Sequence, residues 1–239
     1  MEVDSFDPKG KKFLAISAHP DDACFWAGGT LLKWVAEGAK GAVVICTNGD
    51  KGSNDEKLTS EDIKSIRSIE QAKIGKMLQL EETWFLDYPD AHLEVTQELK
   101  NKLVKIIRSY KPDIVLTFDP ATIYSERFGF VNHPDHRATG QAALDCVYPM
   151  ARDYLNFPEH LSEGLSPHCV RDLFLYNCDK PNYYIDVSNT LEEKFKLMDC
   201  HESQFDMTKI RPLLTERAEL LGKQAGVKAA ESFIYLHLD

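Results

Sequence analysis

The stretch Phe13-Leu-Ala-Ile-Ser-Ala-His-Pro-Asp-Asp22 decides the fold of this chain. Its first six residues form the kind of short apolar run that is typical of a buried strand, and the run ends directly at His19. Gly28-Gly29-Thr30 then opens a predicted helix, which Gly38 stops, and residues 42–46 form the next apolar strand. A strand, a helix and a second strand in this order predict a right-handed β-α-β unit.

The alternation of strands and helices continues along the chain. Further strands are predicted at 84–86, 113–118, 172–176, 183–187 and 233–236, and further helices at 60–78, 96–110, 190–201 and 213–229. We therefore predict an α/β fold: a Rossmann-like, open, mostly parallel sheet with helices on both faces. Residues 1–239 are expected to form one domain, with the core in 1–148 and a C-terminal α/β extension in 149–239.

Two short clusters of metal-ligand residues follow the first and fourth predicted strands. The first is His19-Pro-Asp-Asp22 and the second is His133-Pro-Asp-His136. In an open sheet with strand order 3-2-1-4-5, strands one and four are neighbours, and ligands bind beyond their carboxyl ends. The two clusters are therefore expected to meet at one site, although each alone is also compatible with a capped turn or helix start.

Three residues of these clusters make a suitable ligand set. His19, Asp22 and His136 supply two imidazoles and a carboxylate. A catalytic zinc site uses three such protein ligands and keeps an open position for water, whose pKa the metal lowers to about 7. Cys24 is a further candidate ligand, although a free cysteine is more typical of core packing.

The remaining polar residues of the clusters suit acid–base chemistry. Asp21 diverges from its neighbour Asp22, so it is predicted to be the general base that takes the proton of the water. His133 is predicted to stabilise an oxyanion or to protonate a departing amine. Asp135 is predicted to orient or electrostatically tune one of the imidazoles.

Composition excludes several classes of protein. The 239 residues are 43% hydrophobic and 28% charged, which is ordinary for a water-soluble globular protein. The net charge of −10, without a basic stripe, argues against nucleic acid and anionic membranes as partners. No apolar run approaches the roughly 20 residues of a membrane span, and the polar N-terminus lacks the apolar centre of a secretion signal. Six cysteines without C-x-x-C spacing favour reduced thiols and a cytoplasmic location.

The motifs resemble those of the LmbE-like/PIG-L family of zinc-dependent N-acetylglucosaminyl deacetylases. The resemblance begins with Ala18-His-Pro-Asp-Asp22, Gly28-Gly29-Thr30 and His133-Pro-Asp-His136, and it covers most of the chain. Supporting stretches are Thr47-Asn-Gly-Asp50, Arg67-x-x-Glu70, Phe85-Leu-Asp-Tyr-Pro-Asp90 and His201-Glu-Ser-Gln204. The resemblance implies an enzyme that removes an N-acetyl group, with Zn²⁺ (or Fe²⁺ in the cell) on His19, Asp22 and His136. It gives Asp21 and His133 the roles assigned above.

The same resemblance implies a substrate and an assembly. Arg67 resembles the substrate-contacting arginine of the family, and Asp90 lies in a family-like loop, so both are expected to bind substrate. The expected substrate is a soluble molecule that contains N-acetylglucosamine: a chitin disaccharide, a thiol-cofactor precursor or an antibiotic intermediate. A homo-oligomer, trimeric or hexameric, is expected, in which His237 is a candidate for entering a neighbouring site. Ala23 and Asn132 depart from the family pattern, which often has glutamate and glycine there.

Other functions remain open from the residues alone. The same site suits another amide hydrolase. Two histidines and a carboxylate also form the iron site of facial-triad oxygenases, although those usually have a β-sandwich fold. A non-catalytic nucleotide-binding module is a third alternative, which the lack of a G-x-G-x-x-G motif disfavours.

Overall fold

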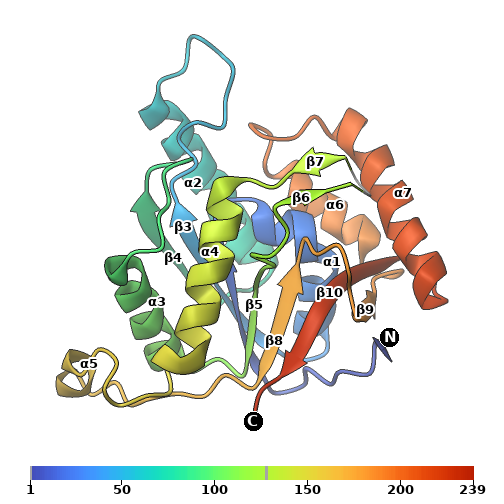
Figure 1. Ribbon diagram of the computed structural model, residues 1–239. Coiled ribbons are helices and arrows are strands. Elements are labelled where there is room, and N and C mark those ends of the chain that lie inside the picture. Colours follow the sequence, from blue (N-terminus) through green and yellow to red (C-terminus); the bar gives the residue numbers. More distant parts are fainter. Residues whose placement is uncertain (1, 127–128) are drawn as a thin grey trace.

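An eight-stranded mixed sheet runs through the computed structural model, which describes residues 2–126 and 129–239 (Figure 1). The strand order is β1-β9-β10-β8-β5-β2-β3-β4. The five strands β4, β3, β2, β5 and β8 are parallel, and they reproduce the predicted order 3-2-1-4-5. The α/β fold with a mostly parallel sheet is therefore confirmed.

The elements follow one another in the predicted alternation. The strands are β1 (Glu2–Val3), β2 (Lys12–Ser17), β3 (Lys40–Thr47), β4 (Glu82–Tyr88), β5 (Ile114–Phe118), β6 (Tyr124–Ser125), β7 (Phe130–Val131), β8 (Asp172–Tyr176), β9 (Tyr183–Asp186) and β10 (Ala230–His237). The helices are α1 (Asp22–Ala36), α2 (Ser60–Met77), α3 (Gln97–Tyr110), α4 (Pro134–Asp145), α5 (Glu159–Ser162), α6 (Leu191–Asp199) and α7 (Met207–Ala225), and a kinked π-type turn, η1 (Cys146–Met150), extends α4.

Helices cover both faces of the sheet, as predicted (Figure 1). Successive side chains of a strand point to opposite faces, and β2 shows this division clearly. Phe13 and Ala15 pack in a core with residues of α1, α2, α6 and α7, whereas Leu14 and Ile16 pack in a second core with α3 and α4. Because both sides of β2 are buried, its sequence is almost continuously apolar.

The start of α1 differs from the prediction. The helix begins at Asp22, so Gly28 and Gly29 lie within it instead of opening it. These glycines allow another segment to approach closely: a Cβ at Gly29 would lie 2.8 Å from Cγ1 of Val187. The glycine pair therefore marks a packing contact and not a helix start, and Asp22 occupies the first helical turn.

The C-terminal third completes the sheet. β8 continues the parallel row beside β5, and β10 pairs antiparallel with both β8 and β9. The division of one domain into a core and a C-terminal extension stays a prediction. The eight-stranded sheet contains strands from both parts. Among the residues described, no helix combines the length and apolar character needed to cross a bilayer.

Candidate metal centre

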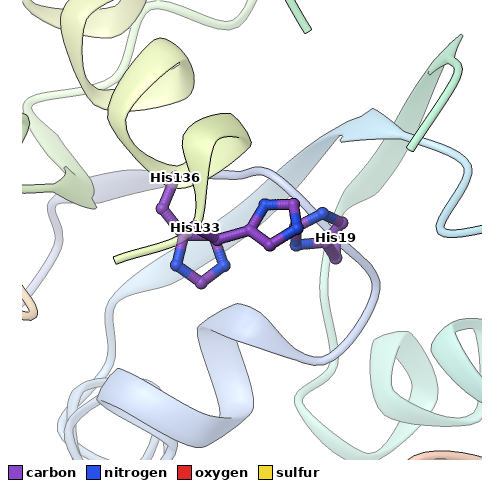
Figure 2. A group of neighbouring side chains, drawn as sticks. All are labelled: His19, His133 and His136. Carbon is purple, nitrogen blue, oxygen red and sulfur yellow. The ribbon is translucent and has the colours of Figure 1, made fainter. Parts of the chain in front are cut away.

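The two predicted clusters meet at the carboxyl edge of the sheet. His19 follows β2, and the second cluster forms the start of α4, which follows the neighbouring strand β5 and the loop beyond it. His133 is the N-cap residue of α4, where its Nδ1 accepts the backbone N–H of Asp135, and Pro134 occupies the first helical position. Figure 2 shows the rings of His19, His133 and His136 gathered in one place.

The carboxylate of Asp22 lies between two imidazoles. Its Oδ1 is 3.2 Å from Nε2 of His136, and its Oδ2 is 3.5 Å from Nδ1 of His19. The backbone N–H of His19 donates to Oδ2 at 2.7 Å and holds the carboxylate in place. A tetrahedral zinc ion at about 2.0–2.1 Å from its ligand atoms keeps them roughly 3.3 Å apart, so the separation of Asp22 from each of the two imidazoles is compatible with such an ion.

Two further carboxylates hold the opposite side of the His19 ring. Nε2 of His19 is 3.1 Å from Oδ1 of Asp90 and 3.3 Å from Oδ2 of Asp135. Burial alone would lower the pKa of His19, but the hydrogen bonds to Asp135, Asp22 and Asp90 raise it well above its usual value. With Nε2 engaged by carboxylates, Nδ1 is the nitrogen that is left to face a cation beside Asp22.

The side chain of Asp135 lies in the protein interior and does not line the cavity beside the metal centre. Its side chain is fully buried, and it accepts the backbone N–H groups of Ala91 at 2.7 Å and Leu93 at 3.1 Å. Its Oδ2 is closer to His19 (3.3 Å) than to Nδ1 of His133 (4.0 Å). The predicted orienting role of Asp135 is therefore directed at His19.

Asp21 is held in an unusual conformation by Arg67. Its φ of +116° is rare for a residue other than glycine, and such backbone strain is found most often at functional sites. Nη2 of Arg67 donates to the carbonyl oxygen of Pro20 at 2.8 Å and lies 3.3 Å from Oδ2 of Asp21, while Nη1 donates to Gly49 at 2.9 Å. Arg67 is only 3% exposed, so its side chain is buried although it lies on an amphipathic helix.

Burial shifts the acidity of the residues around the cavity. It raises the pKa of Asp21 to about 7, against the lowering effect of the Arg67 guanidinium. Burial also opposes the charged form of Asp22, yet the adjacent His136 holds the pKa of Asp22 well below its usual range. The pKa of His133 is lowered, first by burial and then by the neighbouring histidines.

Two sets of side chains in the described residues are close enough to hold an ion. One consists of His19, His133 and His136, and the other of His19, Asp90, His133 and Asp135; in each set the ligand atoms lie within 4.8 Å of one another. A His/Asp metal site is therefore present. Both sets contain His19 and His133, and neither contains Asp22, which the predicted ligand set includes.

The candidate residues line a cavity of about 550 Å³. Its wall includes His19, Asp21, Asp22, Arg67, Asp90, His133 and His136, together with Phe25, Trp26, Lys51, Gly52, Ala91, Gln204 and Phe205. The sequence reasoning had not selected Phe25 and Trp26, although both lie on the face of α1 that carries Asp22, three and four residues away. Gln204 belongs to the stretch His201-Glu-Ser-Gln204, whose only signal in the sequence is its resemblance to the LmbE-like/PIG-L family.

The candidates Cys24 and His237 lie elsewhere, as does His201 of the family-like stretch. Cys24 is buried in the core on the α1 face of the sheet, and burial raises the pKa of its thiol. His201 is fully buried, and its Nδ1 is 3.9 Å from a carboxylate oxygen of Glu70. Nδ1 of His237 lies 2.8 Å from Oδ1 of Asp172. Because Asp172 is the first residue of β8, this contact lies at the opposite edge of the sheet from the metal centre. Entry of His237 into a neighbouring subunit stays a prediction, as does the homo-oligomer.

Comparison with known proteins identifies the family. A model of the family described as "PIG-L: GlcNAc-PI de-N-acetylase" matches residues 14–147, which contain both ligand clusters. The chain belongs to the PIG-L family. It is thus a member of a family of deacetylases, which are amide hydrolases, and the predicted resemblance is confirmed. This membership favours the hydrolase over the oxygenase and the nucleotide-binding module.

Relatives of this PIG-L protein include enzymes with named substrates. The diacetylchitobiose deacetylase of Thermococcus kodakarensis is 32% identical over 236 residues, which cover 95% of this chain and 86% of that protein. A probable N-acetyl-alpha-D-glucosaminyl L-malate deacetylase of Bacillus anthracis is 25% identical and covers 85% of each chain. The solved N,N'-diacetylchitobiose deacetylase of Pyrococcus horikoshii has a TM-score of 0.88 and 32% identity, over 95% of this chain and 84% of that one.

Proposed function

We propose that this protein is a zinc-dependent N-deacetylase that hydrolyses the acetamide of a small molecule containing N-acetylglucosamine. The observation that supports it most is the Asp22 carboxylate between Nδ1 of His19 and Nε2 of His136, at separations that fit a tetrahedral ion. These three residues would hold the ion. When bound, zinc would polarise the acetamide carbonyl and lower the pKa of a water molecule.

The other residues of the cavity would carry the proton transfers. Asp21 would take the proton of the attacking water, whose oxygen bonds to the acetyl carbon. His133 would stabilise the negative charge that develops on the carbonyl oxygen, or donate a proton to the nitrogen. As the C–N bond breaks, the nitrogen gains a proton, either from His133 or the one that Asp21 took from the water, and leaves as a free amine, while the acetyl group leaves as acetate.

Arg67 and Asp90 are proposed to contact the sugar. Both line the cavity, and Asp90 is 5% exposed. The guanidinium of Arg67 is already bonded to Asp21, Pro20 and Gly49, so its part in binding is joined to a structural one. Arg67 would therefore position the side chain of Asp21 and also bind a hydroxyl group of the sugar.

The shape of the cavity supports a substrate larger than a monosaccharide. A second hollow of about 360 Å³ shares Phe25, Trp26, His133 and His136 with the first one. Its remaining wall consists of Phe130, Val131, Asn132, Asn177 and Arg217. Two joined spaces of this size can accommodate N-acetylglucosamine and the unit attached to it.

Acetate release tests this proposal. We expect the zinc-loaded protein to release acetate from one or more of N-acetylglucosamine, its β-1,4 disaccharide and thiol-cofactor precursors. The disaccharide should be preferred over the monosaccharide because it fills both hollows. Treatment with a chelator should abolish turnover, and added zinc should restore it. Absence of acetate from all three substrate types would contradict the proposal.

Phe130→Ala tests the second hollow within the same assay, because Phe130 lines that hollow and not the first one. We expect KM for the disaccharide to rise about tenfold, since an aromatic contact is worth about 0.5–1.5 kcal/mol, with a much smaller change for N-acetylglucosamine. Phe130→Tyr is the matched control, because it keeps an aromatic ring at this position. Equal changes of KM for both substrates would show that the second unit does not use this wall.

A further inference from the structure

Two asparagines hold the side of His136 that faces away from Asp22. Nδ1 of His136 is 3.1 Å from Oδ1 of Asn132, and Nδ2 of Asn177 donates to the same oxygen at 2.9 Å. Asn132 is 2% exposed and Asn177 is 4% exposed. Asn132 lies directly before α4, and Asn177 directly follows β8, so segments far apart in the sequence meet behind one ring.

The amide of Asn132 has a defined orientation. Its Nδ2 donates to the carbonyl oxygen of Thr122 at 2.7 Å. A reversed amide would turn Oδ1 towards that carbonyl, which would place two acceptors together, and would turn Nδ2 towards the NH₂ group of Asn177. Oδ1 of Asn132 therefore accepts from both of its neighbours, and the proton in its contact with His136 belongs to Nδ1.

This proton fixes the tautomer of the ring. With that proton on Nδ1, Nε2 is the ring nitrogen of His136 whose electron pair a metal could use, and it lies 3.2 Å from Oδ1 of Asp22. The ring plane is also defined, because His136 stacks on Phe118 with ring centroids 3.9 Å apart and an interplanar angle of 12°. Nε2 of His136 and Oδ1 of Asp22 thus face each other from fixed positions.

We propose that Asn132 and Asn177 are positioning residues that hold His136 in the tautomer able to bind metal through Nε2. The proposal rests on the metal role assigned to His136 under the proposed function. Carboxylates perform this task for His19, whereas a neutral amide performs it for His136. A neutral partner suits a site that already contains four carboxylates, Asp21, Asp22, Asp90 and Asp135, because it orients the ring without adding charge.

The tautomer can be measured without metal. Long-range ¹H–¹⁵N correlation spectra of metal-free protein, recorded at a pH where the His136 signals show a single ring proton, should place that proton on Nδ1. His136→Gln identifies the signal by its loss. A predominant Nε2-protonated form in the unchanged protein would overturn the proposal, and this result does not depend on whether any substitution folds.

Metal affinity gives the second readout. Loss of a residue that hydrogen-bonds to a metal-bound histidine typically weakens metal affinity about 10–100-fold. Asn132→Ala should therefore weaken zinc binding by that factor in chelator competition. Asn177→Gly, chosen because the φ of Asn177 is +56°, should weaken it less and in the same direction. Asn101→Ala removes a half-buried asparagine that bonds Glu159 and His160, outside the cavity lining of the described residues, and should not change zinc affinity.

The outcomes separate this inference from the proposed function. Unchanged zinc affinity in both folded variants would overturn the role of the asparagine pair and leave the deacetylase proposal standing. Failure of the unchanged protein to bind zinc would contradict the proposed function itself, and the tautomer of His136 would still decide whether the asparagines orient the ring.

Discussion

Asp21→Asn is expected to release acetate about 10²–10⁴ times more slowly than the unchanged protein while keeping its zinc, because a positioned general base contributes a factor of that size. The asparagine side chain has the same shape but cannot accept a proton from water as a carboxylate does. Asparagine also tolerates positive φ better than most residues, so the backbone at +116° should persist. The measurements are kcat for acetate release and zinc content per chain.

Asp55→Asn provides the matched control, because it makes the same chemical change in an exposed loop. It should leave both kcat and zinc content unchanged. Near-normal acetate release by Asp21→Asn would remove Asp21 from the role of general base. Loss of zinc from that variant would instead indicate that Asp21 belongs to the ligand set.

His136→Ala should bind zinc more than about 100-fold more weakly, since even outer partners of metal ligands are worth 10–100-fold. The substitution removes one of the two imidazoles that face Asp22, and the remaining pair of ligands cannot close a three-residue site. Turnover should fall with the metal content. Chelator competition and elemental analysis of the purified protein measure the two effects.

His168→Ala is the control for this prediction, because its ring contacts the carbonyl oxygen of Pro112 and lies outside the cavity lining of the described residues. It should retain zinc. A stoichiometric zinc content in folded His136→Ala would exclude His136 from the ligands and favour a set built on His133.

Much of the fold could be predicted because its signals are local. Buried parallel strands such as β2 are continuously apolar, and the handedness of β-α-β units then restricts the strand order. Placing the two ligand clusters after β2 and β5 was enough to bring them together at the carboxyl edge. The geometry within each cluster follows from short-range spacing, as in the turn between His19 and Asp22.

Other features depend on neighbours that periodicity does not reveal. Arg67 resembles a solvated helix charge, and it is buried only because Gly49 and Gly52 allow the loop after β3 to close over it. The glycine pair in α1 resembles a helix start until Val187 is seen against it. Asn177 carries no motif at all, and its proposed role depends on β8, which lies parallel to β5 and ends beside the loop before α4.

The position of the bound metal tests most directly whether His19, Asp22 and His136 are its ligands. Crystals of the zinc-loaded protein should give an anomalous scattering peak at about 2.0–2.2 Å from Nδ1 of His19, a carboxylate oxygen of Asp22 and Nε2 of His136, with His133 outside the ligand shell. A peak between His19, His133, Asp90 and Asp135, or no peak near His19, would contradict the account.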